Sequence, residues 1–245
     1  LGETVSESPS VEKSWNTVLE DASTSDLADM LVTHALAKYN VGRITEDDLV
    51  RQIDVATDLL VLEAELGNKS HRITDALSWR VGLLAKHVET AEEMCAAGRL
   101  GPANVVLIGH ALARARAQLA GNRKDRKAEL QWREVEVRKA QELRKLVDES
   151  VAVGRARRSD ATDAAFMEME GRVTLARLQG LKKEAIAALR DNVAHQTTVT
   201  QFILEMSRVG AVTATEAATA SATLANAQVA LAIELEDRRL LGEVL

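Results

Sequence analysis

The chain has 245 residues, of which 46% are hydrophobic and 28% charged, so it holds enough apolar material for a sizeable core. The formal net charge of −6 argues against a dedicated nucleic-acid binder, and the 2% of aromatic residues argues against stacking of bases or sugars. The single cysteine, Cys95, excludes an intrachain disulfide. No apolar run reaches the roughly 18 residues of a membrane span, so the sequence predicts no transmembrane helix.

The N-terminal region divides into two parts. Residues 1–10 are polar, show no apolar period and are expected to form a loose tail, whereas residues 11–245 are predicted to form a single repeat domain. A break is expected near Asp21–Ser25, with Ser25 as the cap of a helix that runs to Val41. Because the chain begins at Leu1 and not at a methionine, we expect a processed product whose missing front end is a candidate signal peptide.

Four glycines recur along the chain at one fixed spacing. The intervals between Gly42, Gly98, Gly154 and Gly210 are identical (98 − 42 = 56, 154 − 98 = 56 and 210 − 154 = 56), with no insertion between them. A fixed period of this size is typical of a repeat architecture. Each glycine follows one helical run and precedes another, and glycine adopts a left-handed conformation after a helix without steric cost. The spacing predicts an all-α fold of four tandem antiparallel helical hairpins, with about eight long helices.

Helix starts are expected shortly after each glycine. Two copies carry a threonine three residues before an acidic residue, the pattern of a capping box: Thr45 with Asp48, and Thr213 with Glu216. In the second copy Pro102 follows Gly101 and suits a first helical position. In the third copy Ser159 is expected to be the cap.

A second set of glycines predicts the turns at the opposite ends of the hairpins. These turns are expected at Gly67-Asn68, Gly121-Asn122 and Gly180. Each repeat unit would then contain two helices of roughly 25–28 residues, each about 40 Å long.

We call positions that are separated by this repeat interval a repeat column. Three columns beside the glycines are apolar in all four copies, and we expect them to be buried. They lie seven residues before, one residue before and two residues after each glycine: Ala35, Ala91, Val147 and Ile203; Val41, Ala97, Val153 and Val209; Ile44, Leu100, Ala156 and Val212. The period also equals eight heptads, which favours coiled-coil-like packing in an elongated bundle or a stacked array.

The segments around the glycines carry a resemblance to a known family. Residues 39–49, with Ala56 and the Glu-Ala-Glu-Leu run of residues 63–66, resemble the periplasmic hairpin of TolC-type outer-membrane efflux proteins. Residues 209–213, through Leu224 and Leu231, are similar, and the layout also resembles exported bacterial proteins with repeated glycine-turn helical hairpins. Tandem hairpins, and arginine after glycine in three copies, depart from the efflux family, so a working efflux channel is not expected.

The resemblance implies a location and a mode of binding. In the efflux family the turns at the hairpin tips contact a periplasmic adaptor, so the resemblance implies an extracytoplasmic protein with periplasmic or membrane-associated partners. The positions it marks as a docking surface are Val41, Gly42, Arg43, Gly98, Arg99, Gly154, Arg155 and Gly210.

Catalytic and cofactor motifs are absent from the sequence. There is no G-x-S-x-G, H-E-x-x-H, G-x-G-x-x-G, P-loop or C-x-x-C pattern. None of the five histidines has a glutamate three residues before it, as a di-iron bundle would require. No enzyme activity, cofactor or metal is therefore expected, and His87 and Cys95 are interpreted as packed structural residues.

Arginine and lysine are dense between residues 114 and 145, with interleaved glutamates. This pattern is typical of a solvated helix face with i,i+4 ion pairs. The leading function hypothesis is a non-enzymatic structural or protein-interaction scaffold, with oligomerisation left open. The alternative is a binder of nucleic acid or another anionic polymer through residues 114–145. The third hypothesis, a metal carrier or an enzyme, has no motif behind it.

Overall fold

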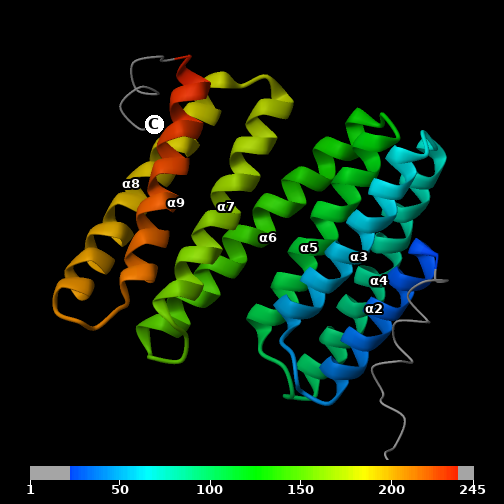
Figure 1. The fold of residues 1–245 in the computed structure, drawn as a ribbon, viewed down its shortest axis with the longest axis horizontal. Coiled ribbons are helices and arrows are strands. Elements are labelled where there is room, and N and C mark those ends of the chain that lie inside the picture. Colours follow the sequence, from blue (N-terminus) through cyan, green and yellow to red (C-terminus); the bar gives the residue numbers. More distant parts are fainter. Residues whose placement is uncertain (1–22, 237–245) are drawn as a thin grey trace, which may run out of the picture. The chain divides into compact units, whose positions relative to one another are not determined.

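The computed structural model describes residues 23–236, which form eight α-helices and no strands (Figure 1). The helices are α2 (Thr24–Asn40), α3 (Glu46–Leu66), α4 (Ser70–Ala96), α5 (Pro102–Asn122), α6 (Arg126–Ala152), α7 (Arg158–Gln179), α8 (Lys182–Arg208) and α9 (Ala214–Leu235). Consecutive helices are joined by short turns, so the predicted all-α fold of tandem helical hairpins is confirmed.

The chain divides into two compact units, Leu1–Thr90 and Ala91–Leu245. In the first unit α2 packs against α3, and α4 contributes all but its last turns. In the second unit the helices from α5 to α9 pack in chain order, each against the next. The single repeat domain over residues 11–245 stays a prediction, and the tail predicted for residues 1–10 lies outside the described residues.

All four repeat glycines lie in left-handed turns, as the spacing predicts. Their φ angles are 69°, 69°, 71° and 73°. In the first copy the Gly42 N–H donates to the Tyr39 carbonyl at 2.8 Å and the Arg43 N–H donates to the Lys38 carbonyl at 2.9 Å. This pair of bonds is a Schellman motif, and the other three copies form the equivalent pair.

The turns at the opposite ends follow a second column of the same period. The left-handed residues there are Asn68, Lys124, Gly180 and Glu236, and the repeat interval again separates them (124 − 68 = 56). The turn expected at Gly121-Asn122 is wrong, because both residues lie inside α5 and the chain turns two residues later. The turns expected at Gly67-Asn68 and Gly180 are confirmed.

A column of alanines lies four residues before these left-handed positions. Its members are buried in every copy: Ala64, Ala120, Ala176 and Ala232. In the first copy the Ala64 carbonyl accepts a hydrogen bond from the Lys69 N–H at 2.8 Å, which closes the turn. A methyl group is small enough for the end of one helix to pack closely against its neighbour, so the column marks these turns even though their left-handed residues differ.

Helix lengths alternate along the chain. Of the helices before a repeat glycine, α4, α6 and α8 have 27 residues, as expected, and α2 has 17. Those after one have 21 or 22 and are shorter than expected. The reason is that the second left-handed column follows each repeat glycine by less than half of the repeat interval (68 − 42 = 26).

Helix α2 begins at Thr24 because Ser23 caps it. The Ser23 hydroxyl accepts a hydrogen bond from the Asp26 N–H at 3.2 Å, and the Ser23 N–H donates to the Asp26 carboxylate at 3.0 Å. The prediction of Ser25 as the cap is therefore wrong, because Ser25 lies in the first turn of the helix. Asp21, the other end of the expected break, lies outside the described residues.

The remaining helix starts keep the repeat register. The capping boxes at Thr45 and Thr213 and the Pro102 start are confirmed. The cap of α7 is Arg157, so the prediction of Ser159 is wrong. Arg157 donates its N–H to the Asp160 carboxylate at 2.9 Å. This hydrogen bond satisfies the backbone N–H at the helix start, although the Arg157 side chain makes no capping hydrogen bond.

Two of the three apolar columns beside the glycines contribute to packing. Seven residues before the glycine, Ala35, Ala91 and Val147 are buried and Ile203 is half-buried; two residues after it, all four side chains are half-buried. The column directly before the glycine is exposed, so its predicted burial is wrong. These residues are helix C-caps, and their side chains extend beyond the packed part of the hairpin.

Candidate functional site: the glycine turns

Each repeat glycine directly follows an aliphatic residue whose side chain is exposed to solvent. The exposed fractions are 67% for Val41, 66% for Val153 and 75% for Val209, and Ala97 is exposed in the second copy. No atom lies within 4 Å of the position that a Cβ would take at any of the four glycines. The tips of the turns are therefore accessible within their units.

Three of the turns also present an arginine directly after the glycine. Arg43, Arg99 and Arg155 are exposed, and within residues 23–236 their side chains form no hydrogen bond or ion pair. A cation close to a helix C-terminus interacts favourably with the helix dipole, which is one reason for arginine at this position. The guanidinium groups also stay available to a partner.

In the second unit three glycine turns lie at one end. The turns between α4 and α5, between α6 and α7 and between α8 and α9 contain Gly98, Gly154 and Gly210. Successive helices run in opposite directions, so every second turn emerges at the same end (Figure 1). The predicted docking residues of the second unit thus lie at one end of its helices, whereas Val41, Gly42 and Arg43 belong to the first unit.

His87 and Cys95 occupy the structural positions that the sequence predicts. His87 on α4 is buried, and its ring meets the Tyr39 ring edge-on with 5.0 Å between centroids. Burial lowers the pKa of His87, and the carboxylate of Glu46 partly offsets that effect. Cys95 is a free, half-buried thiol.

The basic stretch of residues 114–145 is largely paired. Arg133 contacts Glu136 at 2.7 Å and Lys139 contacts Glu142 at 2.8 Å, both with a spacing of three residues, and Arg144 contacts Asp148 at 3.7 Å with the expected spacing of four. The Arg116 guanidinium lies over the Trp132 ring at 4.5 Å. Glu142 is exposed and the Lys139 side chain is partly so, as the solvated-face interpretation predicts, whereas Glu136 is buried. Binding of an anionic polymer stays an untested alternative.

A buried polar contact between α5 and α6 was missed by the sequence analysis. The His110 Nε2 atom lies 4.0 Å from a carboxylate oxygen of Glu136, and both side chains are buried. Burial, with the guanidinium groups of Arg114 and Arg133, lowers the pKa of His110 to about 4 against the opposing charge of Glu170. His110 is therefore neutral at pH 7.

The repeat itself contains the signal that reveals this contact. His110 and Glu136 lie one repeat after Asp54 and Arg80, which form an ion pair at 2.6 Å between α3 and α4. In the next copy the equivalent residues, Phe166 and Asn192, line one cavity of about 380 Å³. Comparing columns on facing helices would have identified one interhelical position with three different chemistries.

Comparison with protein-family models, with curated proteins and with solved structures yields no match to this chain. Across the part of the chain that the structure describes, no group of three or more His, Cys, Asp or Glu side chains is placed to hold a metal ion. Among the same residues, no helix combines the length and the apolar character that crossing a membrane requires.

Proposed function

We propose that the protein is a non-enzymatic interaction scaffold whose glycine turns bind a protein partner outside the cytoplasm. The observation that carries this proposal is the recurrence of an exposed aliphatic residue, a left-handed glycine and, in three copies, an exposed arginine. The resemblance to the periplasmic hairpins of TolC-type proteins supports the location and the class of partner.

The chemistry of the turns suits protein recognition. Aliphatic contact area beside an arginine is typical of the energetically important parts of protein interfaces. The Schellman hydrogen bonds hold each turn rigid before binding, so little conformational entropy is lost on association. Three such turns at one end of the second unit allow simultaneous contacts, which raises the overall affinity.

Site-specific photo-crosslinking in the producing cells tests this proposal. A photoreactive amino acid is placed at Val153 or Val209, and in the matched control at Lys124, which is exposed at the opposite end of the second unit. We expect adducts of one discrete mass from the two valine positions and none from Lys124. Equal adducts from both ends, or none at all, would contradict the proposal.

A variant and a fractionation complete the test. The paired substitution Val153→Ser with Arg155→Ser should abolish the adduct formed from position 153 without changing the helical content. The extracytoplasmic location is checked by fractionating the same cells: recovery of the protein with cytoplasmic markers alone would contradict that part of the proposal.

A further inference from the structure

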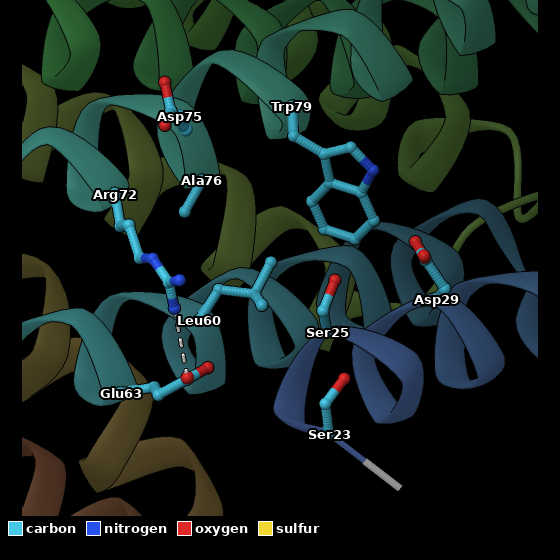
Figure 2. Close-up of a pocket in the computed structure, with 9 residues that line it drawn as sticks. All are labelled: Ser23, Ser25, Asp29, Leu60, Glu63, Arg72, Asp75, Ala76 and Trp79. Carbon is cyan, nitrogen blue, oxygen red and sulfur yellow. Dashed lines mark hydrogen bonds and ion pairs between the residues drawn. The ribbon is translucent and has the colours of Figure 1, made fainter.

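The first unit contains an open cavity of about 510 Å³ where α2 begins (Figure 2). It is lined by the first turns of α2, the last turns of α3 and the first turns of α4. The side chains of Leu60 on α3 and Trp79 on α4 point into the same space, and Arg72 pairs with Glu63 at 3.5 Å on its rim. The cavity thus combines an apolar interior with a charged edge.

Helix α3, which lines this cavity through Leu60 and Glu63, also carries an exposed apolar stripe. It consists of Val55, Leu59, Leu62 and Leu66, which are 48%, 37%, 52% and 82% exposed. Spacings of four, three and four residues place them on one helix face, and Leu59 lies one turn before Glu63 of the cavity. We call the cavity and the stripe together the α3 groove. A contiguous apolar surface of this kind marks a docking site.

The later copies show what covers the equivalent surface. In the fourth copy Ala188 and Leu189 near the start of α8 pack with Ala230 and Leu231 of α9. The positions three repeats before Ala230 and Leu231 are Leu62 and Glu63 (230 − 168 = 62).

The third copy shows the same relation. A Cβ at Gly171 of α7 would lie 3.2 Å from the Val137 Cγ2 atom of α6, and Gly171 is the repeat equivalent of Leu59. In both copies, therefore, the first half of the helix before the glycine covers the second half of the helix after it.

The repeat register assigns this covering role to a particular segment. Helices α4, α6 and α8 begin at residues 70, 126 and 182, so the equivalent start in the first copy is residue 14. Helix α2 begins only at Thr24. The covering residues of the fourth copy, Ala188 and Leu189, correspond to residues 20 and 21, which precede the described chain, whereas Val137 of the third copy corresponds to Ser25 in the first turn of α2.

We propose that residues 11–22 dock along the α3 groove of their own chain. Their apolar residues, Val11, Trp15, Val18 and Leu19, have the i, i+4, i+7, i+8 spacing of one helix face. If α2 simply continued towards the N-terminus, Glu20 would occupy the same repeat column as Ala76 and Ala188, which are both buried. A charged side chain is unfavourable at such a position. The segment therefore docks with its own apolar face, and the Ser23 cap starts α2 anew.

The position of Ser23 favours the same chain over a second copy as the occupant. Ser23 itself lines the cavity, so residues 11–22 are tethered at the groove. A short tether gives an effective concentration on the order of millimolar, which exceeds that of a second copy at micromolar concentration. As a helix, the eight residue steps from Trp15 to Ser23 would span about 12 Å, close to the roughly 10 Å from Leu59 to Leu66.

Disulfide trapping in the full chain tests the docking, with Cys95→Ser as background. The test pairs combine Leu62→Cys with either Trp15→Cys or Val18→Cys. The control pairs replace Leu62→Cys by Arg51→Cys, which is exposed on the same helix one turn before the stripe, about 16 Å along the helix axis from Leu62. We expect at least one test pair to form an intramolecular disulfide ten-fold faster than its control. A disulfide-linked dimer would overturn the proposal in favour of a second copy, and rates equal to the controls for both pairs would overturn it outright.

Thiol labelling provides an independent readout that needs no crosslink. With Leu62→Cys in the same background, we expect the substitution Trp15→Ser to accelerate alkylation of the thiol about ten-fold, while the thermal melt remains cooperative. Alkylation that is already as fast as that of Arg51→Cys before Trp15 is changed would overturn the proposal. Neither experiment depends on the function proposed for the glycine turns.

Discussion

The hairpins α3–α4 and α5–α6 lie one repeat apart and share a backbone, yet their polar chemistry differs. Both close through a left-handed residue four positions after a buried alanine. At the same interhelical position, however, the first holds Asp54 against Arg80 at 2.6 Å, and the second holds His110 against Glu136 at 4.0 Å. The acid and the base have exchanged helices.

The comparison shows that the backbone of this protein repeats more faithfully than its side-chain chemistry. Turn geometry, helix starts and small buried residues recur at the repeat interval, whereas side-chain chemistry at equivalent positions does not. Asp54 is partly open to solvent, but both partners of the second contact are buried. The two hairpins should therefore respond differently to pH and to substitution.

Acidification should produce the largest difference, through His110. Its pKa of about 4 in the folded protein lies below the usual 6.5, so the unfolded chain binds a proton first as the pH falls. The contribution of His110 to the free energy of unfolding is then fully present above about pH 6.5 and is lost towards pH 4, by up to about 3 kcal/mol.

The substitution His110→Leu isolates this contribution, because it removes the titrating group and keeps the apolar contacts. Urea unfolding of the chain and of the variant at pH 7, 5.5 and 4 should show a smaller loss of stability in the variant. If the free energy of unfolding fell equally with pH in the two proteins, the result would contradict a buried neutral histidine.

Valine at the repeat glycine that directly precedes each hairpin should be equally destabilising in the two cases. Gly42 and Gly98 have the same φ of 69° and open space around them, so the cost comes from the backbone alone. Gly42→Val and Gly98→Val should each lower the free energy of unfolding by about 2 kcal/mol, since a β-branched residue is poorly tolerated at positive φ. Thermal melting measures the effect, with Arg99→Val as the exposed control; an unchanged melt for either glycine variant would contradict its turn.

Glycine at the opposite turns should stabilise the two hairpins unequally. Lys124 has a φ of 59°, which is unfavourable for a lysine, whereas Asn68, with a φ of 52°, tolerates this region. We expect a gain of about 1 kcal/mol for Lys124→Gly and about half as much or less for Asn68→Gly. Guanidinium unfolding resolves the difference, and a larger gain at Asn68 would reverse the assignment of strain.

Exchange of the helix caps should have the smallest effect. Thr45 caps α3 with its side chain, whereas Gly101 at the equivalent position of α5 has none. Thr45→Gly should cost a few tenths of a kcal/mol, and Gly101→Thr should gain a similar amount. The double exchange should leave the melting temperature nearly unchanged; a change of several degrees would show that the two positions are not equivalent.

The sequence predicted the features that depend on residue identity. A left-handed turn that requires glycine is visible as a glycine, so the repeat glycines and the all-α fold were predicted correctly. The turn at Lys124 was misplaced because its lysine gives no such signal, and the nearby Gly121 belongs to α5. The cap at Arg157 was missed for the same reason, because Asp160 supplies the capping group.

The surfaces of the molecule were harder to predict. Val41, Val153 and Val209 were expected to be buried because their column is apolar, but a helix C-cap projects beyond the contacts between helices. The contact of His110 with Glu136 joins residues on two different helices, far apart in the chain, and motifs of three- or four-residue spacing cannot detect it. Only a comparison of repeat columns on facing helices relates these two residues to each other.

The shared period of the two turn series has a consequence for the history of the gene. Duplication or loss of a complete repeat block would leave every remaining turn at its own end of its hairpin. Duplication of one helix alone would send every later glycine turn to the opposite end, and a one-residue insertion within a helix would rotate all following side chains on it by about 100°. Copy number is therefore expected to change among descendants in whole blocks, while the spacing within a block stays fixed.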